Sequence, residues 1–422
     1  MSKLALLGGD ALGSQHIKEM TTWPSKLWPT RNELTAEKLK ELYLSNNWAF
    51  GSQIEMDFAQ AFADYHGAKH GIFMANGTVT LQCALAACGV GPGDEVIVPP
   101  HTWMATALAV HYVGATPVFV DTERDTLCLD PEKVSQAINE KTKAIIPVHL
   151  YSSMADMDRL MAIAKKHDLR VIEDCAHMHG GMWDGKGVGT LGDVGSFSCQ
   201  NTKTMGSGEG GICITDDPEL ADLIFRMSHI GYSPGVTQGQ AQDGPREGFI
   251  CHNFRSTGLE ALILNEQLKG LEILLSGYNS AQKYLEARLG KSTKIRFQAP
   301  GRQATVQGHY AWAMIFDDPS YADISIDVIR EAMRAEGLMV TATWAPVYDH
   351  KLFNLGKEHY RIAKAGCHVT EEVMNYTLVL LHQTLGLGEK DLAVVADIIE
   401  KVLNHSDDLR SHEKASQLTA KC

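Results

Sequence analysis

Short apolar runs alternate with amphipathic helical patterns through the first half of the chain. The runs predict six strands, and these lie at 93–100, 115–121, 143–151, 169–176, 192–199 and 210–217. Helical patterns separate several of them, for example at 154–167, where apolar residues recur at helical spacing. Strands that alternate with helices predict βαβ units, and therefore an α/β fold with a mostly parallel sheet covered on both faces.

The pattern changes after residue 258. One long helix is predicted from 258 to about 289, and a helix of this length often leads from one domain to the next. A strand at 310–318 and helices at 325–337 and 389–405 follow it. These elements predict a second, smaller α+β domain.

The domain boundaries follow from this change of pattern. We expect a large domain over 1–280, which includes the N-terminal segment, and a small C-terminal domain over 281–405. The polar remainder, 406–422, is predicted to be a disordered tail.

Composition narrows the classes of protein to consider. Hydrophobic residues make up 44% of the 422 and charged residues 21%, which is typical of a globular protein. The net charge of −13 argues against nucleic-acid binding, although it does not exclude a phosphorylated ligand. No apolar run is long enough for a membrane helix, and the N-terminus lacks a signal-peptide layout. Nine scattered cysteines without a CxxC pair indicate reduced thiols, so we expect a cytoplasmic protein.

Two residues stand where an open α/β sheet binds its ligands. Asp174 ends a predicted buried strand, and a carboxylate buried there needs a partner such as a protonated pyridine nitrogen. Lys203 follows the next strand in a segment of small residues, where glycines allow a bulky ligand to approach the backbone. Ser198, five residues before it, offers a hydroxyl to a phosphate. The alternatives are a helix cap for Asp174 and an ordinary solvent-facing lysine for Lys203.

Several segments together give the chain a resemblance to a known family. They are ANGTVTL (75–81), GDEVIVPPHTW (93–103), ATPVFVD (115–121), PVHLYSSMADMD (147–158), VIEDCAHMHGG (171–181), GSFSCQNTKTMGSGEGG (195–211) and HNFR (252–255). The chain resembles the DegT/DnrJ/EryC1/StrS aminotransferases, fold-type I enzymes that use pyridoxal 5'-phosphate (PLP) to aminate keto-sugars and keto-cyclitols. Within the family, its motifs most resemble those of L-glutamine-dependent scyllo-inosose and 2-deoxy-scyllo-inosose aminotransferases of aminoglycoside pathways.

The resemblance implies roles for four residues around the cofactor ring. Lys203 would bind the cofactor aldehyde and later move a proton, and Asp174 would keep the pyridine nitrogen protonated. His177 would hydrogen-bond near the phenolic oxygen, and Trp103 would stack on the ring face. Trp103 could instead be a core residue, and His177 with His179 could hold a metal; without further ligands at a regular spacing we expect none.

Four further residues are implied for the phosphate. Gly77 and Thr78 would present backbone and hydroxyl donors at the start of a helix, and Ser198 would add a second hydroxyl. Asn253 would reach the phosphate of the neighbouring subunit, which implies a homodimer with shared active sites. The alternative for Gly77 and Thr78 is a plain helix cap.

The implied reaction moves an amino group from L-glutamine to a keto-cyclitol such as scyllo-inosose in two half-reactions. The absence of an obvious basic cluster favours a free cyclitol, and a nucleotide-diphospho-keto-sugar aminotransferase is the alternative. Two other classes of function stay open. One is a dehydratase of the same family, but such relatives carry histidine where this chain has Lys203. The other is a non-catalytic protein of the same fold, which would be expected to lack Lys203 or Asp174. The family also often has glycine where this chain has Ser152, which predicts a different turn there.

Overall fold

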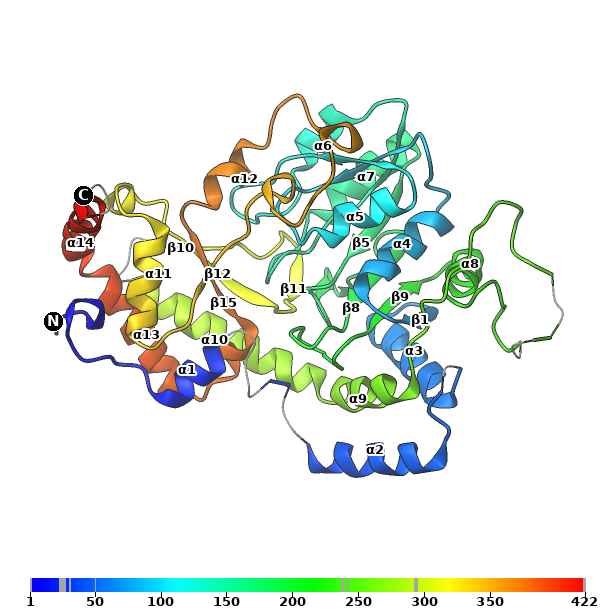
Figure 1. Ribbon diagram of the computed structural model, residues 1–422, viewed down its shortest axis with the longest axis horizontal. Helices are drawn as coiled ribbons and strands as arrows, with labels where there is room; N and C mark the ends of the chain where they lie inside the picture. The colour runs from blue at the N-terminus through cyan, green and yellow to red at the C-terminus, as the bar shows by residue number, and fades with distance from the viewer. Residues whose placement is uncertain are drawn as a thin grey trace.

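The chain forms a large sheet flanked by helices and, beside it, a second unit that holds both ends of the chain (Figure 1). The computed structural model describes residues 2–22, 28–29, 32–49, 51–236, 239–240, 243–291 and 295–419. No helix in these ranges is both long enough and apolar enough to cross a membrane. The eight cysteines within them are all free thiols.

The large sheet has eight strands, and all but one of them run parallel. In spatial order they are β1 (His70–Met74), β9 (Gly211–Thr215), β8 (Val194–Ser198), β5 (Arg170–Asp174), β4 (Thr142–Ile145), β2 (Glu95–Val98), β3 (Thr116–Phe119) and β14 (Arg361–Ile362). The exception is β9, which pairs antiparallel with both β1 and β8. The predicted α/β fold with a mostly parallel sheet is confirmed, and all six predicted strands are present.

Strands buried on both faces explain the continuous apolar runs in the sequence. In β2, Val96 and Val98 pack into one hydrophobic core while Ile97 packs into another. Helices cover both faces, as Figure 1 shows, and the elements around this sheet are α3 (Gln53–His66), α4 (Gly77–Ala87), α5 (Ala105–Tyr112), α6 (Pro131–Ala137), α7 (Met157–His167), α8 (Pro218–Ser228) and α9 (Gly258–Leu268). Helix α2 (Glu33–Ser45) lies outside them against α9.

The second unit is built on an antiparallel sheet. Its strands, in spatial order, are β10 (Arg296–Phe297), β12 (Ala311–Ile315), β15 (Thr377–Leu381) and β13 (Thr341–Ala342). The helices that pack in its core are α1 (Gln15–Thr21), α10 (Leu271–Leu289), α11 (Ile326–Ala335), α13 (Glu389–Leu403) and α14 (Ser406–Thr419), whereas α12 (His368–Val373) packs in the core of the large sheet. A small sheet of β11 (Ala304–Val306), β6 (Met182–Trp183) and β7 (Lys186–Gly187) packs against the core of the large sheet.

Helix α10 passes from one core to the other. Leu271 and Leu275 pack in the core of the large sheet, whereas Leu285 and Leu289 pack in the core of the second unit. The predicted boundary at residue 280 lies inside this helix, and we propose that the two domains meet there. The single long helix predicted from 258 was wrong, because α9 and α10 are separated at Gly270, and glycine is a poor helix former.

Two other expectations about the ends of the chain need correction. The first part of the N-terminal segment packs with the second unit, because Leu4 and Ile17 are buried in its core, whereas α2 packs against α9 of the large domain. The tail predicted to be disordered forms α14, and Leu409 is buried in that same core. One apolar residue in a polar segment anchors the helix, which composition alone does not reveal. Residues 420–422 of the predicted tail lie outside the described ranges.

Candidate active site

A cavity of about 730 Å³ lies at the carboxyl ends of β1, β5 and β8. This is the edge at which open α/β sheets bind ligands. The cavity brings together all but one of the predicted site residues, which are Gly77, Thr78, Trp103, Asp174, His177, Ser198 and Lys203. Asn253 is exposed and does not line the cavity of its own chain.

One end of the cavity is formed by the start of α4 and the end of β8. A Cβ atom on Gly77 would lie 2.6 Å from the Cβ of Ser198, so only glycine lets the helix start approach this closely. Thr78 and Ser198 both line the cavity here, where hydroxyls and the helix N-terminus suit an anion.

The cap of this helix is a residue that the sequence reasoning missed. Asn76 accepts hydrogen bonds from the backbone N–H groups of Thr78 and Val79, each at 3.1 Å. An asparagine directly before an apolar helical run is a known capping signal and could have identified it. The Thr78 amide is therefore used within the chain, and the contribution left for Thr78 is its hydroxyl.

Asp174 ends β5 at the cavity and is buried. Its carboxylate accepts hydrogen bonds from the Thr106 hydroxyl at 2.8 Å and from the Ala176 N–H at 3.2 Å. Both donors are neutral, and burial raises the pKa of Asp174 above its usual value. A cationic ring nitrogen at this carboxylate would remove the cost of holding the negative charge in the interior.

Lys203 lies in the loop between β8 and β9, and its amine faces the cavity. The Nζ atom sits 4.4 Å from the centre of the Tyr310 ring. Burial lowers the pKa of Lys203 from 10.5 to about 8, and the nearby Asp174 opposes this shift. Lowering the pKa frees more of the neutral amine, which is the nucleophilic form.

His177 is held as a neutral ring against the same tyrosine. Its ring stacks on Tyr310 with 3.8 Å between centroids and 7° between planes. The Nδ1 atom accepts a hydrogen bond from the Tyr151 N–H at 3.3 Å, which places the proton on Nε2. Burial lowers the pKa of His177 far below its usual value, so the ring can donate from Nε2 without carrying charge. His179 packs instead against the Phe197 ring.

Aromatic side chains form another wall of the cavity. Trp103 is 47% exposed, so it is not a core residue, and its ring lies 6.0 Å from that of Trp344. Tyr151 and Tyr310 complete this wall. A different turn was expected near Ser152. The unusual backbone angle lies one residue earlier, at Tyr151, whose φ of 58° is rare outside glycine.

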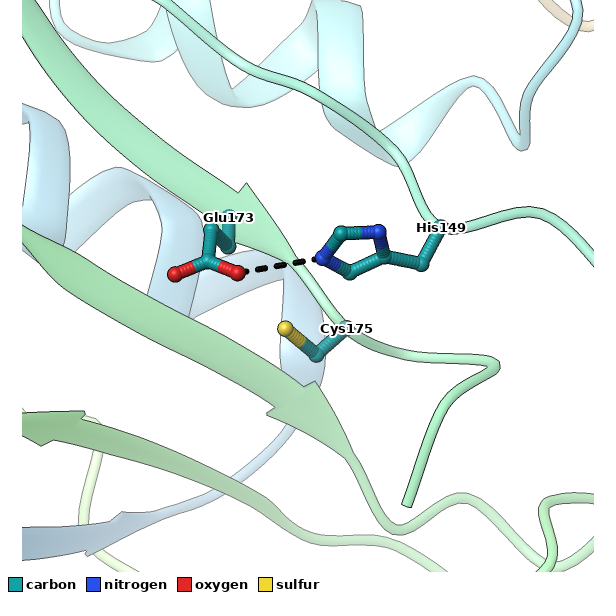
Figure 2. Close-up of side chains that lie close together, drawn as sticks. All are labelled: His149, Glu173 and Cys175. Atoms are coloured by element: carbon teal, nitrogen blue, oxygen red, sulfur yellow. Dashed lines mark hydrogen bonds and ion pairs between the residues drawn. The ribbon is translucent and has the colours of Figure 1, made fainter. Parts of the chain in front are cut away.

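A buried cluster behind β5 also escaped the sequence reasoning. His149, Glu173 and Cys175 lie close enough together to hold a metal (Figure 2). Hydrogen bonds already occupy His149, because Nε2 donates to Glu173 at 3.1 Å and Nδ1 accepts from the Ala155 N–H at 3.2 Å. The cluster is therefore better explained by a structural role, in which its hydrogen bonds connect buried loops of the large domain.

The cavity offers few charges to a ligand. Lys203 is the only cationic side chain among the described residues that line it, and the anionic ones are Asp174 and Glu209. Neutral donors and acceptors supply the remaining polar surface. These groups fit PLP. The Lys203 amine suits the aldehyde, the buried Asp174 carboxylate suits the ring nitrogen, and the end of the cavity formed by Gly77, Thr78 and Ser198 suits the phosphate.

Comparison with known proteins agrees with this geometry. The DegT/DnrJ/EryC1/StrS aminotransferase family matches residues 29–400. The L-glutamine:2-deoxy-scyllo-inosose aminotransferase of Streptomyces lividus is 36% identical, over 96% of this chain and 99% of its own. The enzyme of that name from Micromonospora echinospora is 35% identical, over 97% and 100%. Among solved structures, DesI in the presence of its TDP-sugar product superposes with a TM-score of 0.83 at 26% identity, over 97% of this chain and 99% of its own.

Proposed function

Because the chain belongs to the DegT/DnrJ/EryC1/StrS aminotransferase family, whose members depend on PLP, we propose that it aminates a keto-cyclitol such as scyllo-inosose with L-glutamine as donor. The relatives from Streptomyces lividus and Micromonospora echinospora carry this donor and this class of acceptor in their names. The product would serve a biosynthesis of the aminoglycoside type.

The observation that carries the choice of acceptor is the charge of the cavity. A cyclitol presents a ring of hydroxyls without charge, and neutral donors and acceptors recognise it. A nucleotide-linked sugar brings a diphosphate that needs cations or clustered N–H groups. Lys203 is the only cation among the described lining residues, and we assign it to the cofactor.

We assign the chemistry of the site to three residues. PLP, when bound, withdraws electrons from the carbon that loses or gains a proton. Lys203 would hold the cofactor and would move the proton at that carbon, a role that its lowered pKa suits. Asp174 would keep the pyridine nitrogen protonated, and His177, with its proton on Nε2, would hydrogen-bond near the phenolic oxygen.

The remaining assigned residues bind and orient the cofactor. Gly77, Thr78 and Ser198 would hold the phosphate, and Trp103 would stack on the ring face.

We further propose that the enzyme works as a homodimer in the cytoplasm. Asn253 is exposed and outside the cavity of its own chain, which suits a residue that serves the phosphate of a neighbouring subunit. The free cysteines agree with a reducing compartment. Light scattering of the active enzyme tests the assembly, and an active monomer would contradict it.

The alternative acceptor is a nucleotide-diphospho-keto-sugar, which the likeness to DesI with its TDP-sugar product supports. To decide, the enzyme is first converted to its amino form with L-glutamine and then mixed in single turnover with 2-deoxy-scyllo-inosose, scyllo-inosose or a TDP-linked 4-keto-sugar. We expect rapid return of the visible absorbance with an inosose, at a rate that salt hardly changes because the acceptor is neutral. Return with the TDP-sugar and with neither inosose would overturn the proposal in favour of the alternative.

A further inference from the structure

The peptide groups on both sides of Lys203 are held by side chains from distant parts of the sequence. The carbonyl of Thr202 accepts a hydrogen bond from His382 Nε2 at 3.1 Å. The carbonyl of Lys203 accepts one from Trp28 Nε1 at 3.1 Å. Trp28 precedes α2, and His382 begins the short helix η5 (His382–Gly386) after β15. Neither residue lines the cavity.

The two side chains form one unit with Tyr278. The rings of Trp28 and His382 meet edge to face, with 4.8 Å between centroids and 86° between planes. A carbonyl can only accept, so His382 carries its proton on Nε2, and Nδ1 accepts from the Tyr278 hydroxyl at 3.2 Å. His382 and Tyr278 are both fully buried, which leaves solvent little access to these bonds.

This arrangement fixes the direction in which the Lys203 side chain leaves the backbone. Each peptide group is planar, so the conformation at Lys203 has only two free backbone angles, which relate the two flanking planes. His382 holds the plane before Lys203, and Trp28 holds the plane after it. The Lys203 N–H adds a bond to the Gln200 carbonyl at 2.8 Å. With both planes fixed, the bond from Cα to Cβ has one direction.

We propose that Trp28 and His382 are positioning residues that aim the amine of Lys203 at the cofactor, with Tyr278 fixing the tautomer of His382. The proposal rests on the assignment of Lys203 as the cofactor-binding lysine. It extends the active site beyond the cavity to the N-terminal segment, through Trp28, and to the small domain, through His382. Neither side chain touches the reacting atoms.

The test uses substitutions that remove single polar atoms. Trp28→Phe keeps a ring against His382 but removes the indole N–H, and Tyr278→Phe removes only the hydroxyl. His382→Leu removes both ring nitrogens, and His382→Gln returns one amide donor. Trp183→Phe is the matched control, because it removes an indole bond to Asp158 of 3.1 Å outside the cavity lining.

Two readouts separate positioning from a merely structural role. The first is the pH midpoint of the visible absorbance band of the holoenzyme, and the second is kcat with KM for the amino donor. For Trp28→Phe and His382→Leu we expect kcat to fall about 10- to 100-fold with little change in KM, since a displacement of 1 Å in a reacting group can cost about 100-fold. The band midpoint should move by about half a pH unit or more, which is roughly a threefold change in proton affinity.

The remaining variants grade the effect. His382→Gln should recover part of the loss seen in His382→Leu, Tyr278→Phe should give a smaller loss, and Trp183→Phe should keep the wild-type midpoint and kcat. A wild-type midpoint and kcat in Trp28→Phe and in His382→Leu, even with a lowered unfolding temperature, would overturn the proposal. If His382→Leu does not fold, Trp28→Phe and Tyr278→Phe decide by the same criterion.

Failure of this proposal can be told apart from failure of the lysine assignment. Borohydride reduction of the wild-type holoenzyme followed by peptide mass spectrometry locates the adduct. An adduct on another lysine refutes the assignment of Lys203 and with it the positioning. An adduct on Lys203 together with unaffected variants refutes the positioning alone.

Discussion

Two neighbouring carboxylates on β5 have opposite surroundings. Glu173 faces a sealed region in which four hydrogen bonds reach its two oxygens, at 2.7–3.1 Å, from His149 Nε2 and from the N–H groups of Gly189, Leu191 and Gly192. Asp174, one residue on, faces the cavity and receives two bonds from neutral donors. Successive strand residues point to opposite faces, which separates the two acids.

The difference in hydrogen-bond partners indicates a structural role for Glu173 and a ligand-binding role for Asp174. The protein itself supplies every partner that Glu173 needs, so this acid ties loops together and is closed to ligands. Asp174 has fewer partners and a raised pKa, so a cation from outside the chain would complete its surroundings. Burial alone does not distinguish a structural acid from a functional one, whereas the number of partners supplied by the protein does.

Lys203→Ala should have the largest effect on turnover, because Lys203 lines the same cavity that Asp174 faces. Without the amine, the protein loses both the attachment of the cofactor and the group that moves the proton. We expect turnover to fall by at least about 10⁴-fold, the upper range for one acid–base group. The visible absorbance band that borohydride removes in the wild type should also be absent, which spectra of the purified variant would check. A variant that keeps this band would contradict the assignment.

Asp174→Asn tests the buried carboxylate that faces the same cavity. The change keeps size and hydrogen-bonding capacity but removes the charge that holds the ring nitrogen protonated. Turnover should fall by about 10³-fold, comparable to the loss of a strong electrostatic contact in an active site, while the unfolding temperature changes little. Steady-state kinetics with thermal unfolding checks both parts. Near-normal turnover would show that this carboxylate is not paired with the cofactor.

The reactivity of the Lys203 amine in the cofactor-free protein should depend on pH, and this dependence tests the buried setting of the cavity. Its pKa of about 8, against 10.5 for an exposed lysine, means that the reactive neutral amine appears at lower pH. Reductive methylation followed by mass spectrometry should show half-maximal labelling of Lys203 near pH 8. At that pH its neutral fraction exceeds that of a surface lysine by about 100-fold. A midpoint near 10 would contradict the buried setting of the amine.

Glu173→Gln should have the smallest effect on turnover, because it lies on the sealed face. One oxygen is replaced by an amide that meets N–H donors, so the free energy of unfolding should fall by about 2–3 kcal/mol. The folded fraction should keep its kcat and its visible band. Urea unfolding measures the first effect and steady-state kinetics the second. A large loss of kcat with unchanged stability would show that the two faces are not separate.

The sequence predicted the sheet well, and all but one of the predicted site residues line one cavity. Strands such as β2 are buried along their whole length and leave a continuous apolar run, and Asp174 and Lys203 lie next to such runs. Their proximity follows from the parallel order of β5 and β8, because the carboxyl ends of parallel strands meet at one edge.

The remaining parts of the site depend on long-range packing. Tyr310, Trp28 and His382 reach Lys203 from segments that carry no local signal of that contact. The same limit explains the tail, where one buried leucine anchors a helix in a polar segment, and the break at Gly270, which helical periodicity on both sides conceals.

The one antiparallel strand of the large sheet, β9, has a consequence for the order in which the protein assembles. Strand β9 joins β1 to β8, and its register pairs His70 with Thr215, so this part of the sheet cannot close until a long stretch of chain has been made and collapsed. Closing such a large loop loses entropy before any contact compensates it, and pairings of this kind are slow. Gly77 meets Ser198 only across this closure. Binding of the cofactor phosphate should therefore come late in refolding. Cofactor binding would then follow completion of the sheet and would not start its formation.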